Sequence, residues 1–241
     1  MSTLPCRFAE IMGRIRAAEV RAGRLSGSVR LVAVSKAHPP ETLREAASLG
    51  VEVFGENRIQ EARAKVALLP SRMRWHFLGH LQRNKIRQAL PLFELFHGVD
   101  SLATAADMQR IASETGLFPK ILLEVNVAQE ASKFGFSEQA LERDLEQIMG
   151  MPRLEVLGLM AIPPPGVEPE DSRPYFRRLA ALRDRLEFER GVRLPELSMG
   201  MSGDFEVAIE EGATWVRIGS ALFGERLGRQ WKPESGDFLD V

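Results

Sequence analysis

Eight short apolar runs recur along the chain, and each is separated from the next by a longer, less apolar segment. The runs lie at residues 30–35, 51–54, 74–78, 95–98, 120–127, 155–161, 196–199 and 214–218. Short apolar runs that alternate with helical segments are typical of parallel strands covered on both faces. Eight such units in 241 residues match a (β/α)8 barrel, which typically takes ~250 residues. The pattern therefore predicts a single TIM barrel of the α/β class.

Helical segments are predicted before, between and after these strands. Residues 5–23 predict a helix ahead of the first strand, and further helices are predicted at 40–49, 57–68, 82–92, 101–115, 137–149, 171–190 and 204–211. We expect one domain over residues 1–241, in which residues 1–29 form a helical extension that packs on the barrel. The alternative is an open doubly wound sheet, which usually has a glycine-rich turn after its first strand. Here SKAHPP follows the first strand and contains no glycine, which favours the barrel.

The composition excludes several classes of function. The net charge is −1, and acidic residues are interleaved with the arginines, so no electrostatic basis exists for binding nucleic acid or an anionic membrane. The single cysteine, Cys6, allows no disulfide within the chain and argues against a cysteine-based zinc site. Glu10 and Arg14 interrupt the apolar residues near the start, which argues against a signal peptide or a spanning helix. We expect a cytoplasmic location.

Lys36 is the lysine that directly follows the end of a predicted strand. The other lysines lie on predicted helices, in a loop, in the tail or at the start of a strand: Lys65, Lys85, Lys133, Lys232 and Lys120. Function on this fold sits at the C-terminal ends of the strands. Partial burial favours the neutral amine of a lysine, which can form a Schiff base with a carbonyl compound. The alternative is an ordinary lysine whose stem lies on apolar surface while its charge stays in water.

Two glycine–serine turns follow the last two predicted strands. The first contains Gly200, Ser202 and Gly203, and the second contains Gly219 and Ser220, each ahead of a predicted helix. Backbone N–H groups at helix N-termini bind anions, and the loops after strands seven and eight are the frequent phosphate site of barrels. The pair of turns therefore predicts a phosphate site.

Arg217 lies inside the last predicted strand, two residues before Gly219. Period-two alternation places both residues on the same side of the strand. A buried arginine needs partners with lone pairs. Two interpretations stay open: an internal ion pair with Glu124 or Glu206, or a hydrogen bond to a ring atom of a bound ligand.

Polar residues at other strand ends have simpler interpretations. Asn57 is a plausible N-cap of the helix after strand two, and Asp100 or Ser101 is expected to cap the helix after strand four. His76 and His80 are four residues apart, but they straddle a strand end and a glycine turn, which argues against a metal site. His76 is expected to be a hydrogen-bonded residue of the core or of a pocket.

A strand-end amine, a phosphate site and an arginine between them fit one class of ligand. That class is an aldehyde with a phosphate arm and an aromatic ring, namely pyridoxal 5′-phosphate. The same residues lie in motifs with a family resemblance. The segments VAVSK, FGENRIQEA, WHFLGHLQRNK, GLMAIPP, LSMGMSGDFEVAI and VRIGSALFGER are similar, in this order, to those of the pyridoxal phosphate homeostasis protein family.

The resemblance implies the fold and the site residues. It implies a barrel like the cofactor domain of alanine racemase, with Lys36 holding the cofactor as an aldimine. It further implies that phosphate is bound by Ser202, Gly219 and Ser220, that Arg217 faces the pyridine nitrogen, and that Asn57, His76 and Met199 line the pocket. One departure is Arg58, where the family often has tyrosine.

The resemblance also bears on whether the protein is an enzyme. Racemases resembling this barrel use a lysine and a tyrosine as two bases, and the tyrosine comes from an additional β-domain. The only tyrosine here, Tyr175, falls in the helix after strand six. We therefore expect a monomer that binds and buffers pyridoxal phosphate and delivers it to apo-enzymes. The alternatives are an amino-acid racemase and a barrel enzyme that uses another phosphorylated substrate without the cofactor.

Overall fold

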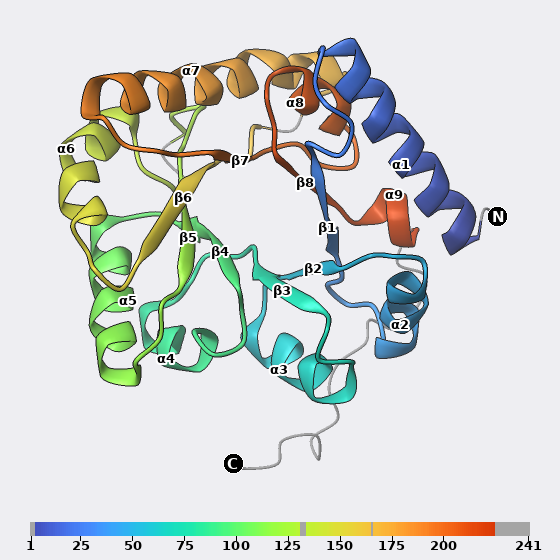
Figure 1. Ribbon diagram of the computed structural model, residues 1–241, viewed down its shortest axis with the longest axis horizontal. Helices are drawn as coiled ribbons and strands as arrows, with labels where there is room; N and C mark the ends of the chain where they lie inside the picture. The colour runs from blue at the N-terminus through green and yellow to red at the C-terminus, as the bar shows by residue number, and fades with distance from the viewer. Residues whose placement is uncertain (1–2, 131–133, 165, 225–241) are drawn as a thin grey trace.

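The computed structural model describes residues 3–130, 134–164 and 166–224 and shows a closed barrel of parallel strands (Figure 1). The strands pair in chain order, and β1 pairs with β8 to close the ring. They are β1 Arg30–Val34, β2 Val53–Glu56, β3 Arg74–Phe77, β4 Leu95–Val99, β5 Lys120–Glu124, β6 Glu155–Met160, β7 Glu196–Ser198 and β8 Trp215–Ile218. The predicted barrel is confirmed, and every predicted strand coincides with an observed one to within about three residues at each end.

The helices surround this barrel. They are α1 Leu4–Arg21, α2 Pro40–Ser48, α3 Ile59–Leu68, α4 Ile86–Ala89, α5 Leu102–Thr115, α6 Glu138–Met149, α7 Arg173–Arg190, α8 Phe205–Glu210 and α9 Ser220–Phe223, with short 3-10 turns η1 Arg83–Lys85 and η2 Pro169–Ser172. The helix predicted over 82–92 is therefore replaced by η1 and the single turn α4. Within the described part of the chain, no helix has the length and hydropathy needed to cross a bilayer.

Helix starts test the predicted caps. Ser101 is the N-cap of α5, and its hydroxyl accepts a hydrogen bond from the Thr104 N–H at 3.2 Å, as expected. The prediction for Asn57 is wrong, because α3 begins at Ile59 and its N-cap is Arg58. The chain stays extended for one residue longer after β2 than the sequence suggested.

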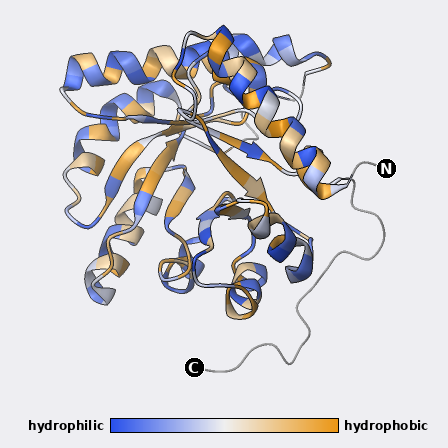
Figure 2. Cartoon of the chain, turned by 45° about the vertical axis from the view of Figure 1, so that its right-hand side comes forward, coloured by the Kyte–Doolittle hydropathy of each residue, from blue (hydrophilic) through white to orange (hydrophobic). Residues whose placement is uncertain are grey.

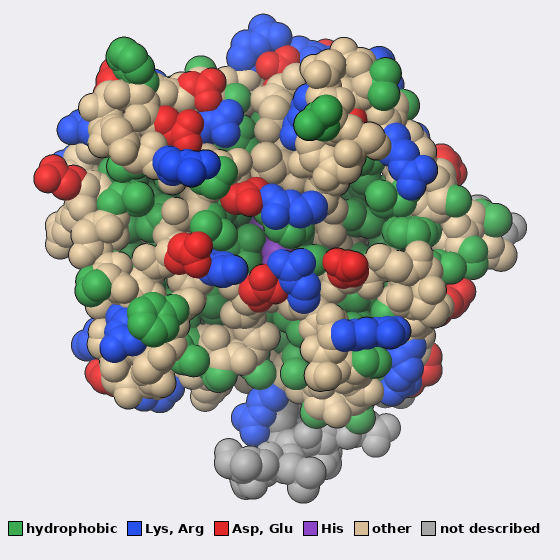
Figure 3. All heavy atoms as spheres, in the orientation of Figure 1, with side chains coloured by type: hydrophobic (Ala, Val, Ile, Leu, Met, Phe, Trp, Pro, Cys, Tyr) green, Lys and Arg blue, Asp and Glu red, His purple; other side chains and the backbone are tan. Residues whose placement is uncertain are grey.

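The strands separate two cores by period-two alternation. Outward-facing residues pack with the helices in one large core, which explains why the strands in Figure 2 are mainly hydrophobic and the helices only partly so. Inward-facing residues form a small core inside the barrel: Val32, Val53, Leu95, Leu122, Met160 and Trp215. Charged side chains cover the end of the barrel seen in Figure 3, where the strands begin. Arg30 and Arg74 start two strands and pair with Glu196 and Glu94 there.

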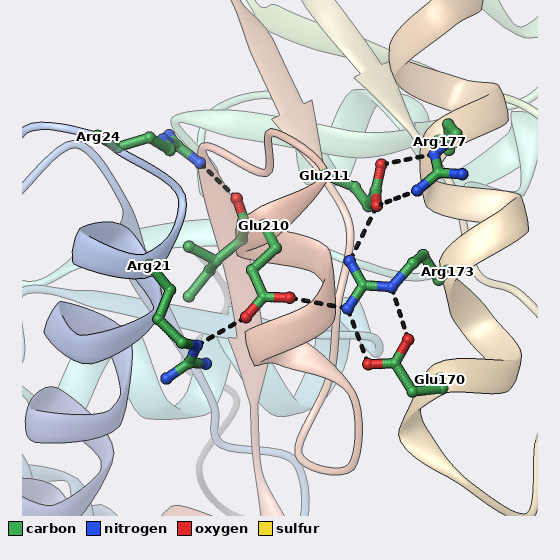
Figure 4. Close-up of polar contacts among 8 residues, drawn as sticks. Arg21, Arg24, Glu170, Arg173, Arg177, Glu210 and Glu211 are labelled. Atoms are coloured by element: carbon green, nitrogen blue, oxygen red, sulfur yellow. Dashed lines mark hydrogen bonds and ion pairs between the residues drawn. The ribbon is translucent and has the colours of Figure 1, made fainter.

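Ion pairs connect α1 and α7 to α8, which lies between them (Figure 4). Glu210 binds Arg21 of α1 at 2.8 Å and Arg173 of α7 at 2.7 Å. Glu211 binds Arg173 and Arg177, both at 2.9 Å. Ion pairs near the surface contribute little singly, about 0–1 kcal/mol, and of the pairs named here Arg21–Glu210 is the one that links α1 to α8.

Candidate functional site at the barrel mouth

Lys36 lies in the turn that follows β1, at the end of the barrel where the strands finish. Its side chain is half-buried, and among the described residues it has no hydrogen-bond or ion-pair partner. The next residue, Ala37, has a φ of 65°, which is unusual for a residue other than glycine. The turn therefore presents the Lys36 amine at the barrel mouth, at some conformational cost.

The two glycine–serine turns meet at one point. The hydroxyl oxygen of Ser202 accepts hydrogen bonds from the N–H groups of Gly219 and Ala221, both at 3.3 Å. These bonds are long, so the backbone N–H groups at the start of α9 are only weakly satisfied. A Cβ added to Gly219 would lie 3.3 Å from the Cβ of Val34, which places this turn beside the end of β1. The predicted phosphate site and Lys36 are thus on neighbouring strand ends.

Arg217 extends from β8 into the barrel interior, where it is 5% exposed. Its Nη1 donates to the carbonyl oxygen of Ser198 at 2.7 Å and to the Ser198 hydroxyl at 2.6 Å, and its Nη2 donates to the Ala161 carbonyl at 3.0 Å. A guanidinium has five N–H donors, so donors remain for a ligand. Burial lowers the pKa of Arg217 to about 10, so it stays charged at neutral pH.

The two carboxylates considered for Arg217 have other roles. Glu206 pairs with Arg14 at 2.7 Å, so that alternative is wrong. Glu124, at the end of β5, influences Arg217 electrostatically, but the two make no direct ion pair. Burial, and secondly the charge of Asp100, raises the pKa of Glu124 to about 7. The mouth therefore contains a carboxyl group that titrates near neutrality.

A buried hydrogen-bonded chain continues from Arg217 across the barrel. Ser198 Oγ lies 2.8 Å from His97 Nδ1, and His97 Nε2 lies 3.0 Å from His76 Nδ1. Because Arg217 can only donate, the Ser198 hydroxyl accepts from it and donates its own hydrogen to His97. His97 then donates to His76. Burial lowers the pKa of His76 to about 3 and that of His97 well below its usual value, so both rings are neutral.

The remaining predicted site residues occupy different layers. His76 is buried against Trp215, at 4.9 Å between ring centroids, and reaches the mouth only through the chain just described. Met199 is fully buried in the outer core, so its side chain is not among those at the mouth. Asn57 is exposed and, with Arg58 and His80, lines a pocket of about 350 Å³ beside the barrel. Ser220 is exposed at the start of α9.

Comparison with known proteins decides the family. Residues 14–227 match the family model of the alanine racemase N-terminal domain. A pyridoxal phosphate homeostasis protein of Aquifex aeolicus is 47% identical over 91% of this chain and 97% of that protein. This chain belongs to the pyridoxal phosphate homeostasis protein family. The family resemblance predicted from the motifs is confirmed.

Solved structures of relatives add to this result. The structure of PipY from Synechococcus elongatus was solved with pyridoxal phosphate bound. It is 41% identical in sequence to this chain and superposes with a TM-score of 0.77, and the match covers 88% of this chain and 99% of PipY. An alanine racemase of Clostridium difficile is 16% identical with a TM-score of 0.69, covering 90% of this chain and 56% of that one. At that identity the racemase shares the fold alone with this chain.

Sequence reasoning missed several buried polar residues of this chain. His97 and Ser198 lie within predicted strands, as His76 and Arg217 do. Applying period-two alternation along each of these strands could have placed all four side chains inside the barrel. Lys65 was assigned only to a helix, but it is completely buried under the Lys36 turn. A lysine at the helix position nearest the strand layer has no sequence signal that distinguishes it from an exposed one.

The raised pKa of Glu124 predicts a pH-dependent stability. The native state holds the Glu124 proton up to about pH 7, whereas the unfolded chain releases it near pH 4.5, so stability falls as the pH rises between these values. We expect Glu124→Gln to raise the free energy of unfolding by about 2 kcal/mol at pH 8 and to change it little at pH 4. Urea denaturation at both pH values measures this. Glu45→Gln, on exposed α2 surface, is the control, and an equal change at both pH values would contradict the assignment.

Proposed function

We propose that this protein holds pyridoxal 5′-phosphate reversibly at the barrel mouth and serves to buffer the intracellular level of this cofactor and deliver it to apo-enzymes. The observation that carries the proposal is the placement of two groups on the neighbouring strands β1 and β8. Lys36 follows β1, and the turn with Gly219 follows β8, where the hydroxyl of Ser202 reaches it from the turn after β7. The homeostasis names of the relatives and the cofactor in PipY support it.

The residues present fit this cofactor. Pyridoxal phosphate supplies an aldehyde that condenses with a primary amine, with release of water, and a phosphate group that carries negative charge. Lys36 Nζ would attach to the aldehyde carbon. The weakly satisfied N–H groups of Gly219 and Ala221, with the hydroxyls of Ser202 and Ser220, would bind the phosphate.

Arg217 would orient the ring. Its spare N–H donors can point at the pyridine nitrogen, and a guanidinium cannot take up a proton there. A ring nitrogen that stays neutral withdraws electrons weakly, which is compatible with a carrier and with a racemase, so Arg217 alone does not decide between them. His76 would contribute through His97 and Ser198, which keep Arg217 in place. Asn57, exposed directly after β2, would contact the cofactor from the edge of the barrel mouth. Met199 would contribute through its packing in the outer core, directly after β7.

The racemase alternative needs a second base close to the substrate Cα. Tyr175 lies on α7, where its partly buried side chain packs against the outer core. His76 is neutral, buried and hydrogen-bonded to His97. Neither residue stands at the mouth opposite Lys36, which favours a carrier over a racemase.

The visible absorption spectrum of the purified protein tests the proposal. We expect added pyridoxal phosphate to bind with a stoichiometry of one, to give the visible band of a lysine-bound cofactor, and to transfer to an added apo-enzyme. A chiral assay over a panel of amino acids should show no racemisation above that of free cofactor. A protein that stays colourless would refute binding, and rapid racemisation would support the enzyme instead.

A further inference from the structure

A buried ionic cluster lies directly under the Lys36 turn. Lys65 of α3 has no exposed surface, and its ammonium group contacts Glu56 Oε1 at 2.6 Å and Glu61 Oε1 at 2.7 Å. Glu56, at the end of β2, is also fully buried, and Glu61 lies on the first turn of α3. We refer to Lys65, Glu56 and Glu61 as the ionic cluster. Its residues join the ends of two strands to one helix.

The ionic cluster holds both peptide groups that flank Lys36. Lys65 Nζ donates to the carbonyl oxygen of Ser35 at 2.8 Å, which belongs to the peptide group before Lys36. Glu61 Oε1 accepts from the N–H of Ala37 at 2.5 Å, which belongs to the peptide group after it. When both peptide planes are fixed, the direction of the Lys36 Cα–Cβ bond is fixed as well. The cluster therefore sets where this side chain points.

The backbone conformation shows that the turn is constrained. Ala37 has a φ of 65°, a region that costs a non-glycine residue about 1 kcal/mol or more. Such a conformation persists only where its surroundings impose it. Two contacts hold it: the His38 N–H donates to the Ser35 carbonyl oxygen at 3.1 Å and closes the turn, and the Ala37 N–H donates to Glu61 in a charge-assisted bond, a kind about twice as strong as a neutral one.

We propose that the ionic cluster positions Lys36 for covalent attachment of the cofactor, with Glu61 as its principal positioning residue. This inference rests on the proposed function. A side chain already held in the right direction loses less conformational entropy when it reacts. The cluster would therefore favour covalent attachment and leave phosphate binding, on β8, unchanged.

The charges of the ionic cluster identify the variant that tests this role. The cluster contains two carboxylates and one ammonium group, so removing Lys65 would leave Glu56 and Glu61 buried without a cation. Removing Glu61 instead leaves Lys65 paired with Glu56. Glu61→Ala is therefore expected to fold, and Glu61→Gln keeps a side-chain oxygen that can accept from the Ala37 N–H.

The experiment compares two ligands. Pyridoxal 5′-phosphate can attach to Lys36, whereas pyridoxine 5′-phosphate has the same ring and phosphate with an alcohol in place of the aldehyde. We expect Glu61→Ala to raise the dissociation constant for the first about tenfold and to leave that for the second within about twofold. Glu61→Gln should restore most of the loss, and Glu45→Ala on exposed α2 surface should match the wild type.

The outcomes separate this inference from the proposed function. If Glu61→Ala weakens both ligands equally or neither of them, the ionic cluster has only a structural role and the inference is overturned. If the wild-type protein attaches no pyridoxal phosphate at Lys36, the proposed function itself fails, and the inference fails with it. A loss confined to the aldehyde ligand and restored by glutamine supports a positioning role.

Discussion

Lys36→Ala should abolish covalent attachment of pyridoxal phosphate while leaving a folded protein that still binds the phosphate group. The side chain is half-buried and has no partner among the described residues, so its removal leaves no unsatisfied charge. The anion site on β8 and the buried Arg217 do not contact it through any described hydrogen bond. We expect the visible band to disappear and the dissociation constant to rise at least about tenfold.

Borohydride reduction followed by mass spectrometry measures this effect directly. The wild-type protein should carry a pyridoxyl group on the peptide that contains Lys36, and the variant should carry none. Lys120→Ala is the matched control, because Lys120 is also half-buried on a barrel strand but lies at the opposite end. A variant that retains the band, with the adduct on another lysine, would show that the site has been assigned to the wrong residue.

Gly158→Ala should have the largest effect on stability. A Cβ at this position of β6 would lie 1.8 Å from the carbonyl oxygen of Glu196 and 2.6 Å from its carbonyl carbon, both backbone atoms of β7. No side-chain rotation can relieve such a contact, so the strands must separate. We expect the free energy of unfolding to fall by about 3 kcal/mol, as measured by urea denaturation.

The control for Gly158→Ala is another glycine in open surroundings. Gly13 lies on α1, and a Cβ there would meet nothing within 4 Å. Gly13→Ala should therefore stabilise the protein by about 1 kcal/mol through helix propensity. If Gly158→Ala changed stability by less than about 0.5 kcal/mol, the close approach of β6 and β7 would be disproved.

The sequence predicted the barrel well because apolar runs report directly on buried strands. The run at 120–127, for example, becomes β5 Lys120–Glu124, and the end of the run at 30–35 places Lys36 at the mouth. The strands pair in chain order around the closed ring, as in a barrel built from successive βα units. The two glycine–serine turns lie close together because they follow β7 and β8, which are neighbours in the barrel.

What the sequence did not predict depends on contacts between residues distant along the chain. One of the two interpretations of Arg217 gave it a carboxylate partner, but neutral oxygens of Ser198 and Ala161 accept its hydrogen bonds. Charge complementarity in a sequence suggests ion pairs, whereas a buried guanidinium is equally well satisfied by carbonyl groups. The burial of Lys65 could not be predicted from the sequence either. It depends on Glu56 and Glu61, which only folding brings next to the Lys65 ammonium group.

Pairing of the first strand with the last also has a consequence for biosynthesis. Lys36 leaves the ribosome early, but Gly219 and its anion site on β8 are made nearly two hundred residues later. Under the proposed function, a nascent chain therefore presents Lys36 before the groups proposed to bind the phosphate have been made. If Lys36 attaches the cofactor as proposed, stable loading waits until β8 has been made, and products truncated before β8 are expected to bind little pyridoxal phosphate.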